Sequence, residues 1–151
     1  MNNFLKEFKD RGYYYQCTNE IELSNLLNKE STNAYIGFDS TAPSLHVGSL
    51  LQIMCLRLLQ KYGHRPIVLL GGGTTRIGDP SGKEETRKIL SEKQIENNIN
   101  NIKKVFKIFL KTNNSKLKPI FVNNYKWLSK LLSLIHISEP TRRYAISYAV
   151  F

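Results

Sequence analysis

Cysteine is scarce in this sequence, and the two cysteines present, Cys17 and Cys55, lie far apart. They lack the paired spacing of a zinc site and are too few for a disulfide framework, so we expect reduced thiols. No apolar run reaches membrane-spanning length, and the first residues alternate apolar and charged side chains, unlike a signal peptide. These absences favour a cytoplasmic protein with no membrane partner and no dedicated metal site.

The composition is that of a globular chain. The 151 residues are 41% hydrophobic and 11% aromatic, which is enough for one domain with its own core and excludes an intrinsically disordered chain. The formal net charge of +10 favours phosphate or nucleic acid as a partner. Lysines on a solvated helix face would give the same charge balance without any ligand.

The apolar pattern predicts helices and strands in alternation. Helices are expected over 3–11 and over 49–62, and Gly63 should end the latter in a left-handed conformation. Another helix is expected to begin at a cap on Thr18, and a further one at a capping box formed by Ser91 and Gln94. Strands are expected over 34–38, 66–70 and 118–122, as the continuous apolar runs typical of parallel strands buried on both faces. This order indicates an α/β protein with a doubly wound parallel sheet.

The last of these helices has an apolar stripe at helical spacing. We expect the stripe to be buried, and it consists of Ile95, Ile99, Ile102, Phe106, Phe109 and Leu110. Four lysines of the same segment lie outside the stripe and are expected in solvent, namely Lys103, Lys104, Lys107 and Lys111.

Polar, glycine-rich segments follow the three predicted strands: DSTAPSLHVGS, GGGTTRIGDPSGK and NNYKW. Ligands of open parallel sheets bind beyond the carboxyl ends of the strands, so we expect these segments to meet there. His46 and Gly48 lie where a helix is predicted to begin, and backbone amides at a helix start suit phosphate. The same pair could equally be an ordinary turn and cap.

The other two features at this edge also leave alternatives open. Gly71 to Gly73 lack the spacing of a dinucleotide fingerprint or a P-loop, so they could admit a ligand, admit a neighbouring chain or form a simple turn. Asp39 and Asp79 could hold an ammonium group or a magnesium ion, although Asp79 precedes Pro80 and could be a turn residue. Lys83 and Arg87 are four apart and could meet phosphates together.

Taken together, YIGFDSTAPSLHVGSLLQ, GHRPIVLLGGGTTRIGDPSGKEETR and NNYKWL resemble, in order and spacing, the amino-terminal half of the bacterial tyrosyl-tRNA synthetase family. The resemblance covers residues 1–131. It implies a truncated Rossmann-like catalytic domain of a class I synthetase, with L-tyrosine, ATP, Mg²⁺ accompanying ATP, and tRNA(Tyr) as ligands. It also implies a cytoplasmic location and a homodimer for the full-length protein.

The resemblance implies a role for each matching residue around the amino acid. Tyr35 matches the residue that meets the substrate's phenol, and Asp79 matches the carboxylate that binds its ammonium group. Gly37 matches a strand-end position beside the substrate and adenylate. Asp39 matches a contact to the ribose or amino group.

Further matches surround ATP. Thr41 matches a contact to the phosphates, and His46 and Gly48 match the first signature motif, which binds ATP at a helix start. Lys83 and Arg87 match mobile basic residues that meet the departing pyrophosphate. Ser49 stands where the family often has histidine, and serine can still donate a hydrogen bond to the ribose.

The implied reaction needs no catalytic serine, cysteine or general base. The carboxylate of tyrosine attacks the α-phosphate of ATP and expels pyrophosphate, and the aminoacyl group then passes to the terminal ribose of tRNA. The protein positions the reactants and stabilises charge on the phosphates. The family's second signature loop is absent, so this chain alone is not expected to charge tRNA.

Two other functions compete with this interpretation. A nucleotidylyltransferase also uses histidines at a helix start, but Ser49 replaces the second histidine, and Tyr35 and Asp79 favour the synthetase. An RNA-binding module could use the lysine-rich helix from Glu92 to Lys111, and its RNA affinity would be salt-sensitive and independent of His46.

Residues 132–151, LSLIHISEPTRRYAISYAVF, resemble a translated sequencing adapter. Adapter codons match Leu132 to Arg142 in order and, after a gap, Ile146 to Phe151. We therefore expect a non-native tail in which His136, Glu139 and Arg142 have no function. The alternative is a genuine amphipathic tail.

Overall fold

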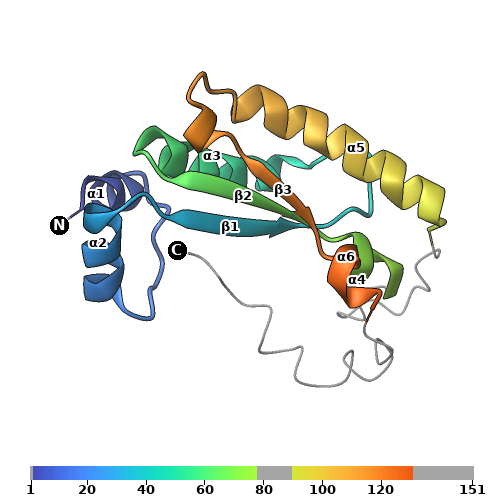
Figure 1. Ribbon diagram of the computed structural model, residues 1–151, viewed down its shortest axis with the longest axis horizontal. Coiled ribbons are helices and arrows are strands. Elements are labelled where there is room, and N and C mark those ends of the chain that lie inside the picture. The colour runs from blue at the N-terminus through green and yellow to red at the C-terminus, as the bar shows by residue number, and fades with distance from the viewer. Residues whose placement is uncertain (1, 78–89, 131–151) are drawn as a thin grey trace.

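A parallel sheet forms the centre of the molecule (Figure 1). The computed structural model describes residues 2–77 and 90–130. The sheet contains β1 (Asn33–Phe38), β2 (Arg65–Leu70) and β3 (Ile120–Asn123), paired in the order β1-β2-β3. All three predicted strands are confirmed, with ends shifted by one or two residues. The predicted tail and the predicted site residues Asp79, Lys83 and Arg87 lie outside the described residues.

The helices are α1 (Asn3–Asp10), α2 (Glu20–Lys29), α3 (Val47–Lys61), α4 (Gly72–Ile77), α5 (Glu92–Phe109) and α6 (Tyr125–Leu128), with a 3-10 turn at Ser115–Leu117. The Ser91–Gln94 capping box at the start of α5 is confirmed, as is the left-handed Gly63, with φ 85°. The predicted cap at Thr18 is wrong. Asn19 caps α2 instead, because its side chain accepts a hydrogen bond from the backbone N–H of Glu22 at 3.1 Å.

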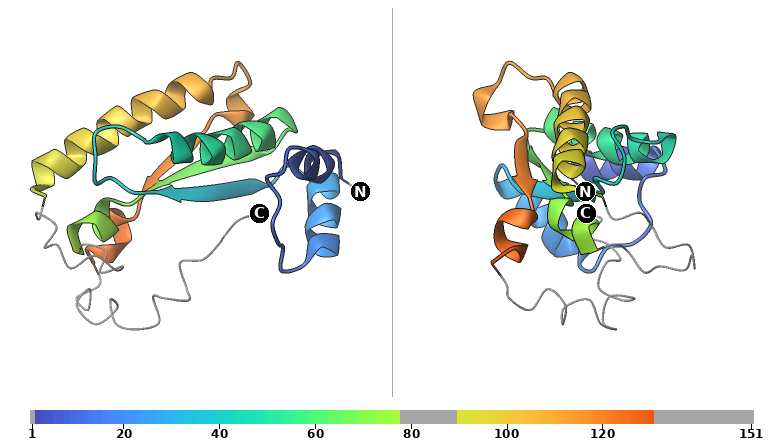
Figure 2. Two further views of the ribbon diagram at one scale, coloured as in Figure 1. Left: turned by 180° about the vertical axis from the view of Figure 1, so that it is seen from behind. Right: turned by 90° about the vertical axis from the view of Figure 1, so that its right-hand side faces the viewer.

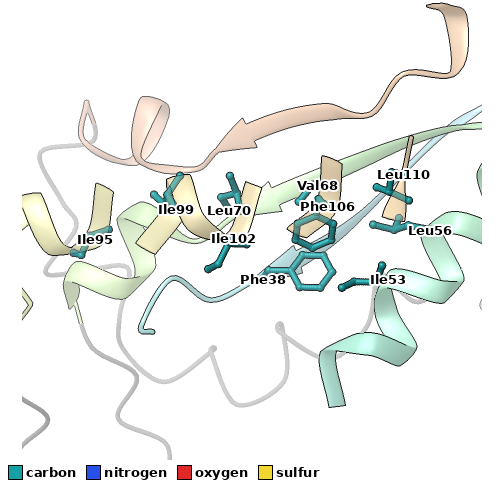
Figure 3. Close-up of a cluster of buried hydrophobic side chains, with 10 residues drawn as sticks. All are labelled: Phe38, Ile53, Leu56, Val68, Leu70, Ile95, Ile99, Ile102, Phe106 and Leu110. Atoms are coloured by element: carbon teal, nitrogen blue, oxygen red, sulfur yellow. The ribbon is translucent and has the colours of Figure 1, made fainter. Parts of the chain in front are cut away.

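Helices α3 and α5 cover one face of the sheet (Figure 2). Their apolar side chains meet those of β1 and β2 in one buried cluster (Figure 3), which contains Phe38, Ile53, Leu56, Val68, Leu70, Ile95, Ile99, Ile102, Phe106 and Leu110. The rings of Phe38 and Phe106 pack edge to face, 4.6 Å apart. This cluster confirms the predicted stripe except at Phe109, the last residue of α5, which is 38% exposed.

The opposite face of the sheet is not covered to the same extent. Along β1, Ala34 and Phe38 are buried while Tyr35 and Gly37 are exposed, so the prediction of burial on both faces is wrong for this strand in the described part of the chain. The register places Tyr35 beside Ile67 and Gly37 beside Leu69. Because side chains alternate along a strand, these four positions share the face that the described helices leave less covered, where Ile67 and Leu69 are half-buried.

A second apolar cluster joins α1 to the carboxyl-terminal half of α3. Phe4, Leu5 and Phe8 are buried there against Leu58 and Leu59, as the helical spacing predicts. Helix α3 is not buried on all sides, since Leu50 and Leu51 are exposed. Among the helices in residues 2–77 and 90–130, none has the length and apolarity to cross a membrane.

Candidate active site

Tyr35 and Gly37 lie on the less covered face of β1, Tyr35 in the middle of the strand and Gly37 next to its last residue. The side chain of Tyr35 is 43% exposed. A Cβ added at Gly37 would meet no described atom within 4 Å, and the residue is not among those with positive φ. Neither packing nor backbone conformation therefore requires glycine at position 37, and the open space beside it could receive a ligand.

The glycines after β2 are explained differently. A Cβ at Gly72 would lie 2.4 Å from Oδ1 of Asn123, and one at Gly73 would lie 2.9 Å from Cδ1 of Leu128. Both glycines are buried and belong to the first turn of α4, which the sequence did not predict. Two of the alternatives left open are found together: the glycines form the turn from β2 into α4, and a later segment of the same chain approaches Gly72 and Gly73 closely.

Asp39 and Thr41 follow β1, and both are exposed. The backbone N–H of Gly71 donates to the carbonyl of Phe38 at 2.9 Å, which brings the turn after β2 against the end of β1. A Cβ at Gly71 would lie 3.5 Å from Oδ1 of Asp39, so the carboxylate adjoins the glycine turn. The structure thus joins the first two polar segments at the carboxyl edge of the sheet, as predicted.

His46 is the N-cap residue of α3. Its Nδ1 accepts a hydrogen bond from the backbone N–H of Gly48 at 3.0 Å, which leaves Nε2 as the ring nitrogen able to donate. A Cβ at Gly48 would lie 2.8 Å from Cε1 of His46. His46 and Gly48 are exposed at the predicted helix start, whereas Ser49 is buried.

Asn124 joins the end of β3 to the glycine turn. Its Oδ1 accepts from the N–H of Gly73 at 2.7 Å, and its Nδ2 donates to Oγ1 of Thr74 at 3.3 Å. The sequence predicts the NNYKW segment at this edge but indicates no role for any one of its residues. The structure gives Asn124 a role in holding the turn.

Arg76 at the end of α4 was also missed. Its guanidinium stacks on the ring of Tyr125 at 3.7 Å, and it forms an ion pair with Glu92 at 2.5 Å. These contacts connect α4 to α6 and to the first turn of α5. No spacing in the sequence links the three residues, so only the fold reveals the contact.

A cleft of about 150 Å³ lies elsewhere, between the end of α1 and the outer side of α3. It is lined by Arg11, Tyr13, Met54, Arg57, Leu58 and Lys61. Glu7 pairs with both Arg11 and Lys61, and these partners, with a hydrogen bond from Tyr62, lower the pKa of its carboxyl to about 2. Two of the cleft's cations are therefore already paired, and none of the predicted site residues in the described part of the chain lines the cleft.

Within residues 2–77 and 90–130, no three His, Cys, Asp or Glu side chains gather closely enough to hold a metal ion. Asp39 is the predicted site carboxylate that lies in this part of the chain.

Comparison with known proteins agrees with the geometry. The sequence model described as tRNA synthetases class I (W and Y) matches residues 27–143, a range that continues past the predicted boundary at 131. The tyrosine–tRNA ligase of Pelagibacter ubique is 66% identical over 147 residues, or 97% of this chain and 36% of that protein. The ligase of Rickettsia bellii is 49% identical over 144 residues, which cover 95% of this chain and 35% of that protein.

A solved structure shares the fold. The crystal structure of a C-terminally truncated mitochondrial tyrosyl-tRNA synthetase from Coccidioides posadasii superposes with a TM-score of 0.68 at 28% identity. The match covers 89% of this chain and 39% of that one. The chain therefore spans little more than a third of the length of these relatives, and it belongs to the class I tRNA synthetases (W and Y).

Proposed function

We propose that the full-length protein, meaning this chain continued to the length of its relatives, is a tyrosine–tRNA ligase. It activates L-tyrosine with ATP and transfers the product to tRNA(Tyr), in the cytoplasm and as a homodimer. The names of the relatives support this, since those compared are tyrosine–tRNA ligases at 66% and 49% identity.

The observation that carries the proposal is the open space at Gly37. No atom of the described residues lies within 4 Å of where its Cβ would be, yet the residue stands in a strand, where glycine is unfavourable. Tyr35 lies two positions away on the same face, with its hydroxyl-bearing ring partly exposed. We assign this surface to the aromatic amino acid, with Tyr35 meeting the phenol and Asp79 the ammonium group.

ATP is assigned to the adjoining edge. The N-terminus of α3 offers backbone N–H groups and a partial positive charge, and Nε2 of His46 is able to donate to a phosphate oxygen. Asp39 and Thr41 flank this region after β1, with Asp39 assigned to the ribose or amino group and Thr41 to the phosphates. We assign Lys83 and Arg87 to pyrophosphate, and Ser49 to the ribose.

The chemistry follows from positioning. The tyrosine carboxylate attacks the α-phosphate, the bond to pyrophosphate breaks, and the leaving charge is stabilised by the cationic groups around it. Mg²⁺ arrives with the ATP phosphates, and we assign it no ligand set from the chain. Selectivity against phenylalanine comes from the polar groups around the phenol, which would lose their hydrogen-bond partner.

Tyrosine binding to the full-length protein tests the assignment. Asp79→Ala should nearly abolish binding in calorimetry, and Tyr35→Phe should narrow the preference for tyrosine over phenylalanine. Asp10→Ala, an exposed aspartate at the end of α1, serves as the matched control and should bind like the wild type. Unchanged tyrosine affinity in Asp79→Ala would show that the ammonium site is misplaced.

A further inference from the structure

We propose that Thr75 and Asn98 are positioning residues for ATP, because together they fix the backbone of Ser40 between Asp39 and Thr41. We call the two hydrogen bonds that they form with Ser40 the Ser40 clamp. The inference rests on the proposed function, since it takes Asp39 and Thr41 as the ATP contacts.

The clamp holds both backbone polar groups of one residue. The N–H of Ser40 donates to Oγ1 of Thr75 at 3.2 Å, and its carbonyl accepts from Nδ2 of Asn98 at 2.9 Å. Thr75 belongs to α4 and Asn98 to α5, so side chains from two separate helices hydrogen-bond to the backbone just after β1. Ser40 is fully buried, at 0% exposure, whereas its neighbours Asp39 and Thr41 are exposed.

Asn98 is a polar residue buried among apolar side chains. It lies on the buried side of α5 beside Ile95, Ile99 and Ile102, and it is only 8% exposed. A buried amide is unfavourable unless it is hydrogen-bonded, and the described bond of its Nδ2 goes to Ser40. Asn98 thus interrupts the apolar stripe of α5 at the position where its side chain hydrogen-bonds to Ser40 in the loop after β1.

The side chain of Ser40 does not explain its burial. Its hydroxyl is buried without a hydrogen-bond partner among the described residues, so the bonds that fix the residue are those of its backbone. Backbone bonds on both sides of one residue set the direction in which the chain leaves it. The clamp therefore determines how Asp39 and Thr41 are presented.

Thr75 provides the cleaner test, because valine matches its shape but lacks the accepting oxygen. In the full-length protein we would measure tyrosine-dependent exchange of pyrophosphate into ATP. Thr75→Val should raise KM for ATP roughly three- to tenfold, the effect of one lost hydrogen bond, with KM for tyrosine within about twofold. Thr75→Ser keeps the oxygen and should restore KM for ATP to near the wild-type value.

Asn98→Leu gives a second test, with Asn97→Leu as its matched control on the exposed side of the same helix. Asn98→Leu should raise KM for ATP as Thr75→Val does, and Asn97→Leu should not. A fall in kcat with both KM values unchanged would indicate loss of folded enzyme and would overturn the clamp. An equal rise in Thr75→Ser and Thr75→Val would also overturn it, because the oxygen would then be irrelevant.

If the wild-type protein exchanges pyrophosphate with tyrosine but neither Thr75→Val nor Asn98→Leu changes KM for ATP, the clamp is wrong and the function stands. If the folded wild-type protein shows no tyrosine-dependent exchange, the proposed function and the clamp are both overturned.

Discussion

The imidazole of His46 and the backbone N–H of Gly48 form a 3.0 Å hydrogen bond that closes the first turn of α3. One side chain thus caps the helix through Nδ1 and keeps Nε2 as a donor. The missing side chain of Gly48 makes this possible, since a Cβ there would lie 2.8 Å from the ring. The two interpretations of this pair, cap or phosphate site, are therefore compatible in one geometry.

Substitutions of His46 should separate its two roles. Asparagine can cap a helix, but its amide is too short to place an N–H donor where Nε2 of histidine lies, so His46→Asn should retain the free energy of unfolding while weakening ATP binding by the full-length protein. His46→Ala should remove both the helix cap and the phosphate donor, and it should lower the free energy of unfolding by about 0.5–2 kcal/mol. Chemical denaturation and ATP titration are the measurements, and equal ATP affinity in wild type and His46→Asn would contradict the phosphate assignment.

Two glycine substitutions should behave in opposite ways. Gly72→Ala forces a methyl group to within 2.4 Å of the Asn123 amide, whose oxygen already accepts from the N–H of Tyr125, and should cost about 1–3 kcal/mol of stability. Gly37→Ala enters open space and should leave the stability of the chain unchanged or slightly higher. Urea unfolding compares them, and equal losses in both variants would show that the space at Gly37 is not open.

Gly37→Ala should nevertheless impair the full-length protein, because we assign that space to the substrate. We expect tyrosine affinity to fall while the melting temperature holds. Wild-type affinity in this variant would remove the main support for the site.

Stability should decline as the pH falls below about 6.5, partly because of His64. The side chain is 3% exposed, its Nδ1 accepts from the N–H of Thr32, and burial lowers its pKa below the ordinary value of 6.5. The unfolded chain then binds more protons than the native one, so acid favours unfolding, and stability returns as the pH rises above 6.5. His64→Asn should flatten the dependence of the free energy of unfolding on pH in this range. An unchanged slope between pH 7.5 and 5.5 would show that other groups cause the pH dependence.

The segment 132–151 should differ in an independently sequenced copy of the gene. If these residues derive from an adapter, the reading frame there should instead continue into sequence like that of the relatives, beginning near codon 132. The family match extends to residue 143, so residues 132–143 are the informative ones. Recurrence of the same codons in a second source would establish the tail as native.

The strands and the start of α3 could be predicted because local patterns determine them. Apolar runs marked β1 and β2, and the cap at His46 lies within two residues of its partner. Thr18 and Asn19 are both good caps, and their order in the sequence does not decide between them. The exposure of Tyr35 could not be predicted, since an apolar run does not reveal which face has a covering helix.

Asn98 was missed for a related reason. Its partner Ser40 lies 58 positions away, and only the packing of α5 against the end of β1 brings them together. A polar residue within an apolar stripe was the available signal, but it does not name the partner.

The most direct test of the account is amino acid-dependent pyrophosphate exchange by the full-length protein. Labelled pyrophosphate should enter ATP when L-tyrosine is supplied and remain at background with each of the other common amino acids. His46→Ala should sharply reduce that exchange, whereas Lys104→Ala on the solvated side of α5 should not. Exchange that proceeds without an amino acid, or with a different one in place of tyrosine, would contradict the account.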